Sequence, residues 1–376
     1  MKSILISGTF LFLLITSCEK IQSGPETKDT EEDQPGTIYS DIEYTSAGTS
    51  SSAARAGMFS TSIGSKAYFV SGVSTSPKQL PASDIDIYDG ETFQWTKTFL
   101  PQPQYMSRIS ESYSPFQVIN EYVFYKKYVP MGVDGPSERI QFYNLLTQET
   151  RFITLAEARL VEAVAIAGDK VFISGGTYSV GSIPQPSQFA SDLYDLKTQK
   201  TISLPVDSSF AITRAVGFGK KIYTTGLAYT GTVPDTSERI RVYDTEKASW
   251  SEMKLAGNTK ADVICAIDGK IAFGGSDKKL HFYDPQTAGF TESAFPGGDE
   301  LYGTFTVAGN LLIVLGISDV HVYNTRTGVW TRKQLENTRY DATVAVAKDL
   351  VVVAGGTDGA DLNSPVTKVE FFKLKK

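Results

Sequence analysis

A hairpin motif built on a tyrosine recurs along the chain and constrains its fold more than any other feature. The motif is clearest in Val322–Trp330, where Tyr323-Asn324 ends one apolar run and Trp330 begins the next, seven residues after the tyrosine. An extended run, a polar turn and a second run predict a β-hairpin. A hairpin that recurs every 40 to 55 residues predicts a repeat architecture. The other close copies are Tyr88–Trp95, Tyr243–Trp250 and Tyr283–Phe290, and looser copies open at Tyr143 and Tyr194.

Two further strands are expected before each hairpin. Each repeat opens with a run of small and β-branched residues, passes a tight turn such as Asp268-Gly269, and reaches a nearly continuous apolar run. These second runs do not alternate between polar and apolar residues, which predicts strands buried on both faces. The sequence therefore predicts an all-β fold, a seven-bladed β-propeller with four-stranded antiparallel blades. The seven second runs are 67–70, 122–125, 171–173, 221–223, 271–273, 311–314 and 350–353.

Blade seven lacks a fourth strand in chain order. Its third strand is expected at 368–374, close to the end of the sequence. Residues 38–44 form a strand-like stretch before blade one and have no other partner. We expect this N-terminal strand to close the ring, because it would cover a sheet edge that otherwise invites aggregation. The propeller domain is predicted to span residues 37–376.

The glycines and the hairpin motif together resemble the kelch family of β-propellers. Most second runs end in glycine, as at Gly355-Gly356, and the third strand ends in the Tyr-Asp pair that precedes the tryptophan. The kelch repeat has the same order of Gly-Gly, Tyr-Asp and Trp, and the resemblance covers about residues 53–376. It implies the fold but little about function, since kelch propellers include enzymes, sugar binders and protein-docking modules. Blade two departs from the pattern, with Lys126-Lys127 in place of the glycine pair.

The N-terminal segment resembles the signal of a bacterial lipoprotein. Lys2 precedes an apolar run from Ile4 to Ile15, which is shorter than the about 20 residues that span a bilayer. The run ends in Ile15-Thr16-Ser17-Cys18, which resembles a lipobox, whose cysteine is lipidated and becomes the first mature residue. We expect a lipoprotein signal peptide over 1–17 and a lipid on Cys18. An ordinary signal peptide followed by an unmodified cysteine is the alternative.

Residues 18–36 are predicted to form a disordered acidic tether. They contain Thr, Pro, Gly and many acids but almost nothing apolar, so they cannot bury enough surface to fold. Glu19-Lys20 resembles the start of lipoproteins of the Bacteroides group. The resemblance implies a lipid anchor in the cell envelope, at the outer membrane, and leaves the periplasmic and the surface-exposed side open. We expect membrane contact through the N-terminal lipid only.

Composition limits the partners and the chemistry. The formal net charge of −6 argues against a nucleic-acid partner. Two cysteines and two histidines argue against a disulfide framework and a His-rich metal site. The sequence also lacks the phosphate-loop, nucleophile-elbow and zincin motifs. No cofactor and no metal are expected.

Galactose oxidase, a kelch-like enzyme, holds copper with two histidines and two tyrosines, one of them linked to a cysteine. His281 and His321 stand two residues before the motif tyrosines, so the repeat itself places them on third strands. We expect core histidines there and a buried structural cysteine at Cys265, which leaves the copper site unsupported.

An acidic stretch in the last long loop is a candidate for calcium binding. Asp358, Asp361 and Asn363 follow Gly355-Gly356, but their spacing matches no calcium loop, and a solvated turn is favoured.

A near-periodic basic residue marks the place where each first strand is expected to begin. Blade six breaks this pattern with Tyr302. Since the same face of a propeller carries the loops that join strands two and three, these residues are predicted to bind an anion beside the long loops. The alternative is that the arginines bond loop carbonyls within their own blades. The predicted ligand-binding set is Arg55, Arg108, Arg159, Arg214, Lys260, Arg339 and Tyr302.

These features favour a binding module over an enzyme. The ligand is expected to be a glycan, most simply an acidic one, or an acidic protein segment. The alternative is a carbohydrate-active enzyme of the sialate mutarotase or epimerase type, which is also kelch-like. That activity would need a carboxylate beside a basic residue, and Glu162 near Arg159 and Asp262 near Lys260 are the candidates. A partner subunit in an envelope complex is a third hypothesis.

Overall fold

A computed structural model gives the fold of this chain. It describes residues 37–50, 54–73, 83–101, 112–129, 133–134, 137–175, 179–180, 183–184, 189–230, 233–235, 239–254, 261–275, 277–297, 304–358 and 365–376. The predicted signal peptide, Cys18 and the tether lie outside these ranges. The described residues all belong to one compact unit, Asp33–Lys376. Among them, no helix is long and apolar enough to span a membrane.

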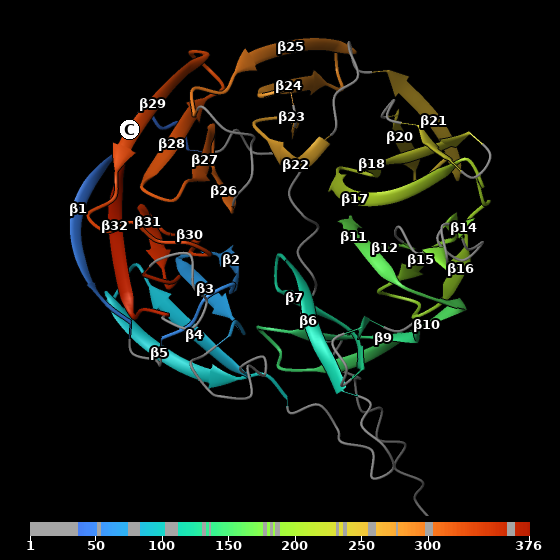
Figure 1. The fold of residues 1–376 in the computed structure, drawn as a ribbon, viewed down its shortest axis with the longest axis horizontal. Helices are drawn as coiled ribbons and strands as arrows, with labels where there is room; N and C mark the ends of the chain where they lie inside the picture. Colours follow the sequence, from blue (N-terminus) through green and yellow to red (C-terminus); the bar gives the residue numbers. More distant parts are fainter. Residues whose placement is uncertain are drawn as a thin grey trace, which may run out of the picture. The chain divides into compact units, whose positions relative to one another are not determined.

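Seven antiparallel sheets of the described residues stand around a central axis, each with four strands in order from the centre outward (Figure 1). The all-β, seven-bladed prediction is confirmed. Blade two is a regular blade, although it lacks the glycine pair.

The strands of the first four blades follow chain order. Blade one contains β2 (Phe59–Ile63), β3 (Lys66–Val70), β4 (Asp84–Asp89) and β5 (Gln94–Phe99). Blade two contains β6 (Ser112–Ile119), β7 (Tyr122–Val129), β9 (Ser137–Asn144) and β10 (Thr150–Arg159). Blade three contains β11 (Val161–Ala167), β12 (Lys170–Gly175), β15 (Ser191–Asp195) and β16 (Thr201–Ser203). Blade four contains β17 (Phe210–Phe218), β18 (Lys221–Thr230), β20 (Arg239–Asp244) and β21 (Ser249–Lys254).

The last three blades complete the ring. Blade five contains β22 (Ala261–Ile267), β23 (Lys270–Gly275), β24 (Lys279–Asp284) and β25 (Gly289–Ala294). Blade six contains β26 (Phe305–Ala308), β27 (Leu311–Leu315), β28 (Asp319–Asn324) and β29 (Val329–Gln334). Blade seven contains β30 (Thr343–Ala347), β31 (Leu350–Ala354), β32 (Lys368–Lys375) and, from the N-terminal part of the chain, β1 (Asp41–Thr49).

Pairing of β1 with β32 closes the ring, as predicted. Asp41 lies opposite Lys375, and Thr49 lies opposite Lys368. The strand is displaced from the predicted 38–44, because its second half consists of small, exposed residues that carry no apolar signal. Tyr39 precedes the strand and donates its backbone N–H to Asn310 Oδ1 at 2.7 Å, which fixes the chain against blade six.

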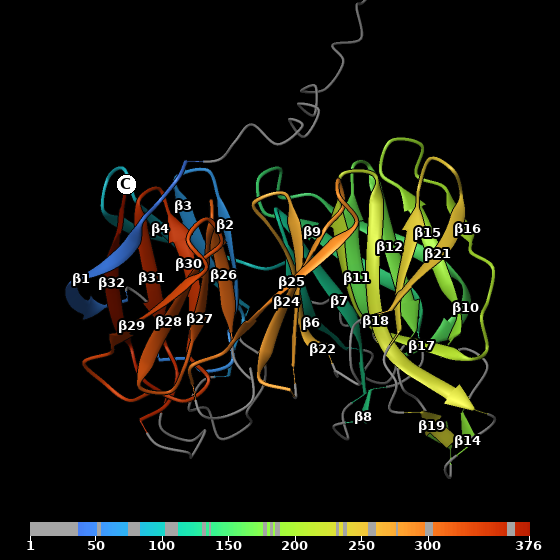
Figure 2. The same cartoon turned by 90° about the horizontal axis from the view of Figure 1, so that it is seen from above.

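The two faces of the ring differ in their connections (Figure 2). Strands one and two, and strands three and four, are joined by short turns on one face, here called the turn face. The opposite face, called the loop face, carries the connections between strands two and three. In blades one, three and seven these connections cover 71–83, 176–190 and 355–367, but blades five and six keep only 276–278 and 316–318. Four two- or three-residue strands belong to the longer connections: β8 (Val133–Asp134), β13 (Ser179–Val180), β14 (Ile183–Pro184) and β19 (Val233–Asp235).

The hydrophobic core lies between neighbouring sheets. Ile42 of β1 is 1% exposed and belongs to one apolar cluster with Val322 and Leu335 of blade six and Phe372 of blade seven. Tyr44 of the same strand meets the Phe372 ring edge-on, with ring centroids 5.6 Å apart. The closing strand therefore contributes core side chains as well as backbone hydrogen bonds.

We predict that Ile42→Ala destabilises the propeller by about 2–5 kcal/mol, the usual loss when a buried isoleucine is truncated. Ile38→Ala is the matched control, because Ile38 is 56% exposed and lies just outside β1. Urea unfolding followed by tryptophan fluorescence measures both. Equal stabilities of the two variants would contradict a structural role for the closing strand.

Candidate functional site

The Tyr-Asp part of the repeated motif stabilises the outer hairpin of each blade. The tyrosine of the third strand lies directly opposite the aromatic residue of the fourth strand, with ring centroids 5.0–5.1 Å apart in the four close copies. The acid or amide that follows the tyrosine accepts hydrogen bonds from two backbone N–H groups of the turn, as Asp89 does from Glu91 and Thr92. At Asp195, the Lys170 ammonium and two such N–H groups lower the pKa of the carboxyl to about 2. The motif is therefore structural.

Three arginines of the predicted ligand-binding set lie inside their blades. Arg55, Arg159 and Arg339 are 1%, 1% and 2% exposed. Each guanidinium pairs with a buried carboxylate on the third strand of the same blade: Arg55 with Asp86, Arg159 with Asp192 at 2.8 Å, and Arg339 with Glu370 at 2.7 Å. Contact with a ligand would need an exposure that these three side chains lack in this structure.

The same arginines also bind loop carbonyls, which was the alternative reading of the sequence. Arg339 donates to the carbonyl oxygens of Gly355 and Lys368 at 3.3 and 2.8 Å. Its partner Glu370 accepts from the backbone N–H of Glu336 at 2.9 Å, where the chain arrives from blade six. Asp192 accepts in the same way from Ala156. Each arginine–carboxylate pair thus fastens the connection between two blades to the sheet that follows it.

Blade four replaces this pair with a different contact. In blades one, three and seven, the carboxylate residue of the third strand lies in register with a residue of the first strand, which is Ser60, Val164 or Val344. The buried arginine stands five residues before that first-strand residue. In blade four, the first-strand residue at this place is Ala215, and the residue five positions before it is Phe210, which is 1% exposed. Arg241 takes the place of the carboxylate residue, lies 5.9 Å from the Phe210 ring and pairs with Asp207 at 3.0 Å.

Arg214 consequently does not occupy the place of the three buried arginines. It lies four residues after Phe210, is exposed, and donates to the carbonyl oxygen of Thr213 at 2.8 Å. Arg108, Lys260 and Tyr302 lie outside the described residues. Ligand binding by the set as a whole stays a prediction.

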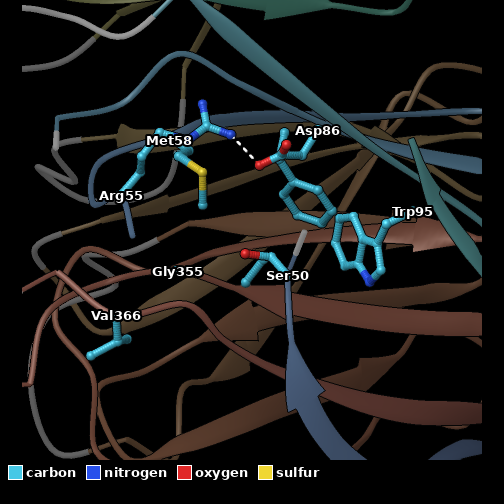
Figure 3. A pocket seen from close by; sticks show the side chains of 9 residues that line it. Ser50, Arg55, Met58, Asp86, Trp95, Gly355 and Val366 are labelled. Carbon is cyan, nitrogen blue, oxygen red and sulfur yellow. Dashed lines mark hydrogen bonds and ion pairs between the residues drawn. The ribbon is translucent and has the colours of Figure 1, made fainter. Parts of the chain in front are cut away.

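A small cavity adjoins the Arg55–Asp86 pair at the contact between blades seven and one. Ser50, Met58, Trp95, Gly355 and Val366 line it (Figure 3). Its volume is about 10 Å³, roughly the least that accommodates one water molecule, so a sugar ring cannot fit. A second hollow of about 220 Å³ lies on the turn face between blades four and five, beside Lys220, Tyr223 and Glu246. It is open and smaller than the about 300–1,000 Å³ usual for small-molecule pockets.

The residues of the galactose-oxidase comparison are buried, His281 and Cys265 in blade five and His321 in blade six. His281 Nε2 lies 2.7 Å from Asp277, and His321 Nε2 lies 3.1 Å from Asp319. Burial lowers the pKa of His321 and raises the pKa of Cys265 to about 12. Among the described residues, no three His, Cys, Asp or Glu side chains are placed to hold a metal ion. Asp358 is exposed, whereas Asp361 and Asn363 are not among the described residues.

The best candidate for ligand contact is the loop-face end of the innermost strands in blades three to five. In each of these strands the pairing with the second strand of the blade shifts by one residue, which forms a β-bulge. The bulged residues are Glu162, Thr213 and Asp262, and they occupy equivalent places in their blades. Bulges redirect side chains and are enriched next to binding sites. Glu162 is half-buried, and Arg214 follows the second bulge. We call Glu162, Thr213, Arg214 and Asp262 the inner-rim site.

The inner-rim strands stand close together. A Cβ added to Gly217 of β17 would lie 1.7 Å from the carbonyl oxygen of Ile166 in β11, so only glycine permits this approach. That approach is near the turn-face ends of the two strands, whereas Glu162 and Arg214 lie at or beside the bulges of adjacent blades, farther towards the loop face. Arg159 does not join Glu162 there, because its guanidinium is bound to Asp192.

Comparison of the sequence with protein-family models and with curated proteins assigns no relative. No protein-family model matches the chain, and no curated protein matches its sequence. The propeller itself is shown by the structure, while the kelch resemblance rests on the repeated residues.

We predict that Arg159→Met costs about 3–5 kcal/mol of stability, because it leaves the buried Asp192 without its cation. The double variant Arg159→Met/Asp192→Leu should regain most of that loss, since it removes both charges. Arg214→Met, at an exposed position, should change stability by less than about 0.5 kcal/mol. Chemical unfolding compares the three, and a stable Arg159→Met single variant would contradict the structural role.

Proposed function

We propose that this protein is a lipid-anchored binding module of the bacterial cell envelope whose loop face binds an acidic glycan. The proposal rests on the difference in connection length between the two faces of the ring. The long connections gather on the loop face, and propellers with such surfaces bind ligands there because loops vary while the scaffold holds them in place. The chain joins the ring from the opposite, turn face, at Tyr39 and Asn310.

The inner-rim site supports a charged sugar as the ligand. The Arg214 guanidinium can donate two parallel hydrogen bonds to a carboxylate, as uronic and sialic acids would offer. The Glu162 carboxylate can accept hydrogen bonds from sugar hydroxyls. An acidic protein segment would bind Arg214 through its carboxylates but would offer no sugar hydroxyls to Glu162. Acidic peptides are therefore the ligands against which the glycan is tested.

A second candidate is an enzyme of the sialate mutarotase or epimerase type. Such an activity needs a carboxylate close to a basic residue, and Glu162 with Arg214 in the neighbouring blade offers one combination. Proton NMR of any bound sugar distinguishes the candidates, because a binding module leaves the anomer ratio to change at its spontaneous rate.

The anchor is tested at Cys18. We expect Cys18→Ala to release the protein from the membrane fraction, because the lipid is the only predicted link of the tether to the bilayer. Fractionation and intact-mass measurement of the mature protein check this. An unmodified cysteine in the wild-type protein would refute the anchor.

The ligand is tested on a panel of acidic and neutral glycans and acidic peptides. We expect Arg214→Ala to weaken binding of an acidic glycan by about 1.5–3 kcal/mol, the contribution of a charged hydrogen bond, without changing the melting temperature. Affinity should also fall as salt rises, since exposed charges are screened over about 8 Å at physiological ionic strength. Arg326→Ala is the matched control, because Arg326 is an exposed arginine on the turn face.

Selective binding of neutral glycans, or equal losses with Arg214→Ala and Arg326→Ala, would exclude the inner-rim site. Binding of the acidic peptides alone would replace the glycan with a protein ligand.

A further inference from the structure

One nitrogen of each buried arginine has no partner within its blade. Arg55, Arg159 and Arg339 hold carboxylates and carbonyl oxygens with their terminal nitrogens. The Nε–H group of each is also buried, yet it has no hydrogen-bond partner among the described residues. A buried donor without a partner is costly, and an ordered water molecule commonly satisfies it. Because the same nitrogen is involved in three blades, the feature belongs to the repeated pair and not to one side chain.

The cavity at the contact between blades seven and one lies beside this nitrogen in blade one. Arg55 and Asp86 line it together with the apolar side chains of Met58, Trp95 and Val366 (Figure 3). Its volume of about 10 Å³ is close to the least that holds a water molecule, so no larger ligand fits. The size of the cavity therefore selects its occupant.

The cavity also offers the polar partners that a buried water molecule needs, which number two to four. The Arg55 Nε–H group is a donor, and the Ser50 hydroxyl on the opposite wall can donate or accept (Figure 3). The Asp86 carboxylate is a third partner, because a carboxylate accepts several hydrogen bonds at once. Water can accept from Arg55 and donate to the two oxygens.

The charges around the cavity favour a neutral occupant over an ion. The Arg55 guanidinium pairs with the Asp86 carboxylate, and the two side chains are only 1% and 4% exposed. Their charges cancel, so an anion here would lie against Asp86 and a cation would lie against Arg55. Removing an ion from water without a counter-charge costs far more than burying one water molecule.

Three segments of the ring closure meet at this cavity. Ser50 directly follows β1 and donates its backbone N–H to the carbonyl oxygen of Thr367 at 2.8 Å. The carbonyl oxygen of Arg55 accepts from the backbone N–H of Gly356 at 2.9 Å. The cavity thus lies between the end of the closing strand, the 355–367 connection of blade seven and the start of blade one.

We propose that one water molecule is bound in this cavity, between the Nε–H group of Arg55 and the hydroxyl of Ser50, as a fixed part of the ring closure. It satisfies the buried nitrogen of the Arg55–Asp86 pair. It also connects the chain that follows β1 to blade one, a link that the pairing of β1 with β32 does not make. The site is independent of the glycan and of the lipid anchor.

The first test is a crystal structure of the chain from residue 18 onward with Cys18→Ala, which retains every described residue. We expect one isolated density peak within about 2.7–3.2 Å of both Arg55 Nε and Ser50 Oγ. Crystals soaked in sodium bromide should show no anomalous signal there. Absence of the peak, a protein oxygen bound to Arg55 Nε, or a bromide signal at this place would overturn the proposal.

The second test uses the sign of a stability change. We expect Ser50→Ala to lower the melting temperature by about 1–4 °C, because the water molecule loses one of its partners. A cavity without water predicts the same or a higher melting temperature, since the substitution would then remove an unpaired hydroxyl. Differential scanning calorimetry measures the difference.

Ser46→Ala is the matched control, because Ser46 is an exposed serine of β1. It should melt like the parent. Equal melting temperatures of Ser50→Ala and Ser46→Ala would contradict the bound water, whereas a lower value for Ser50→Ala alone, with the density peak in the parent, would establish it.

Discussion

The pairing of β1 with β32 is the interaction on which the ring depends. A propeller has no continuous core. Each sheet buries one face against the sheet before it and the other against the sheet after it, so an incomplete blade exposes both a sheet edge and an apolar face. Here eight residues of β1 pair along β32, and Ile42 adds its side chain to the cluster shared by blades six and seven. The remaining contacts join blades that follow one another along the chain, except that blades seven and one also meet, as where the Ser60 hydroxyl donates to the carbonyl oxygen of Val344 at 2.8 Å.

Repetition allows the same structural task to be met by different chemistry. The residue two positions before the third-strand aromatic is polar in every blade, and it is a carboxylate in blades one, three and seven. In blade four it is Arg241, which contacts Phe210 and Asp207, and in blades five and six it is a histidine paired with a nearby aspartate. In each case a buried polar group obtains a partner, which the low dielectric of the interior requires. The charge of an individual residue at this place therefore says little about ligands.

The sequence was sufficient for the fold because hairpin turns and apolar runs are local signals. The Tyr-to-Trp spacing indicated the outer hairpin, and the missing fourth strand indicated the closing role of the N-terminal stretch. The arginines could not be interpreted in the same way, since their roles depend on register across three strands. Arg214 and Arg55 look equivalent along the chain, yet a displacement of four residues exposes one and buries the other. The buried pairs could have been predicted from the polar residue that stands two positions before each third-strand aromatic residue. In the blades with a buried arginine this residue is a carboxylate: Asp86, Asp192 or Glu370.

Closure by strands from distant parts of the sequence also sets the order in which the molecule can form. The hydroxyl of Ser40 donates to the carbonyl of Lys375 across 335 positions, and no local contact can substitute for that bond. Contacts of such sequence separation form slowly, since the entropy of closing the loop is lost before the contact is gained. The first six blades can assemble one after another as the chain emerges, whereas blade seven waits for β32 to meet β1. Until then the edges of β1 and β32 are unpaired, and such exposed edges can pair with other chains.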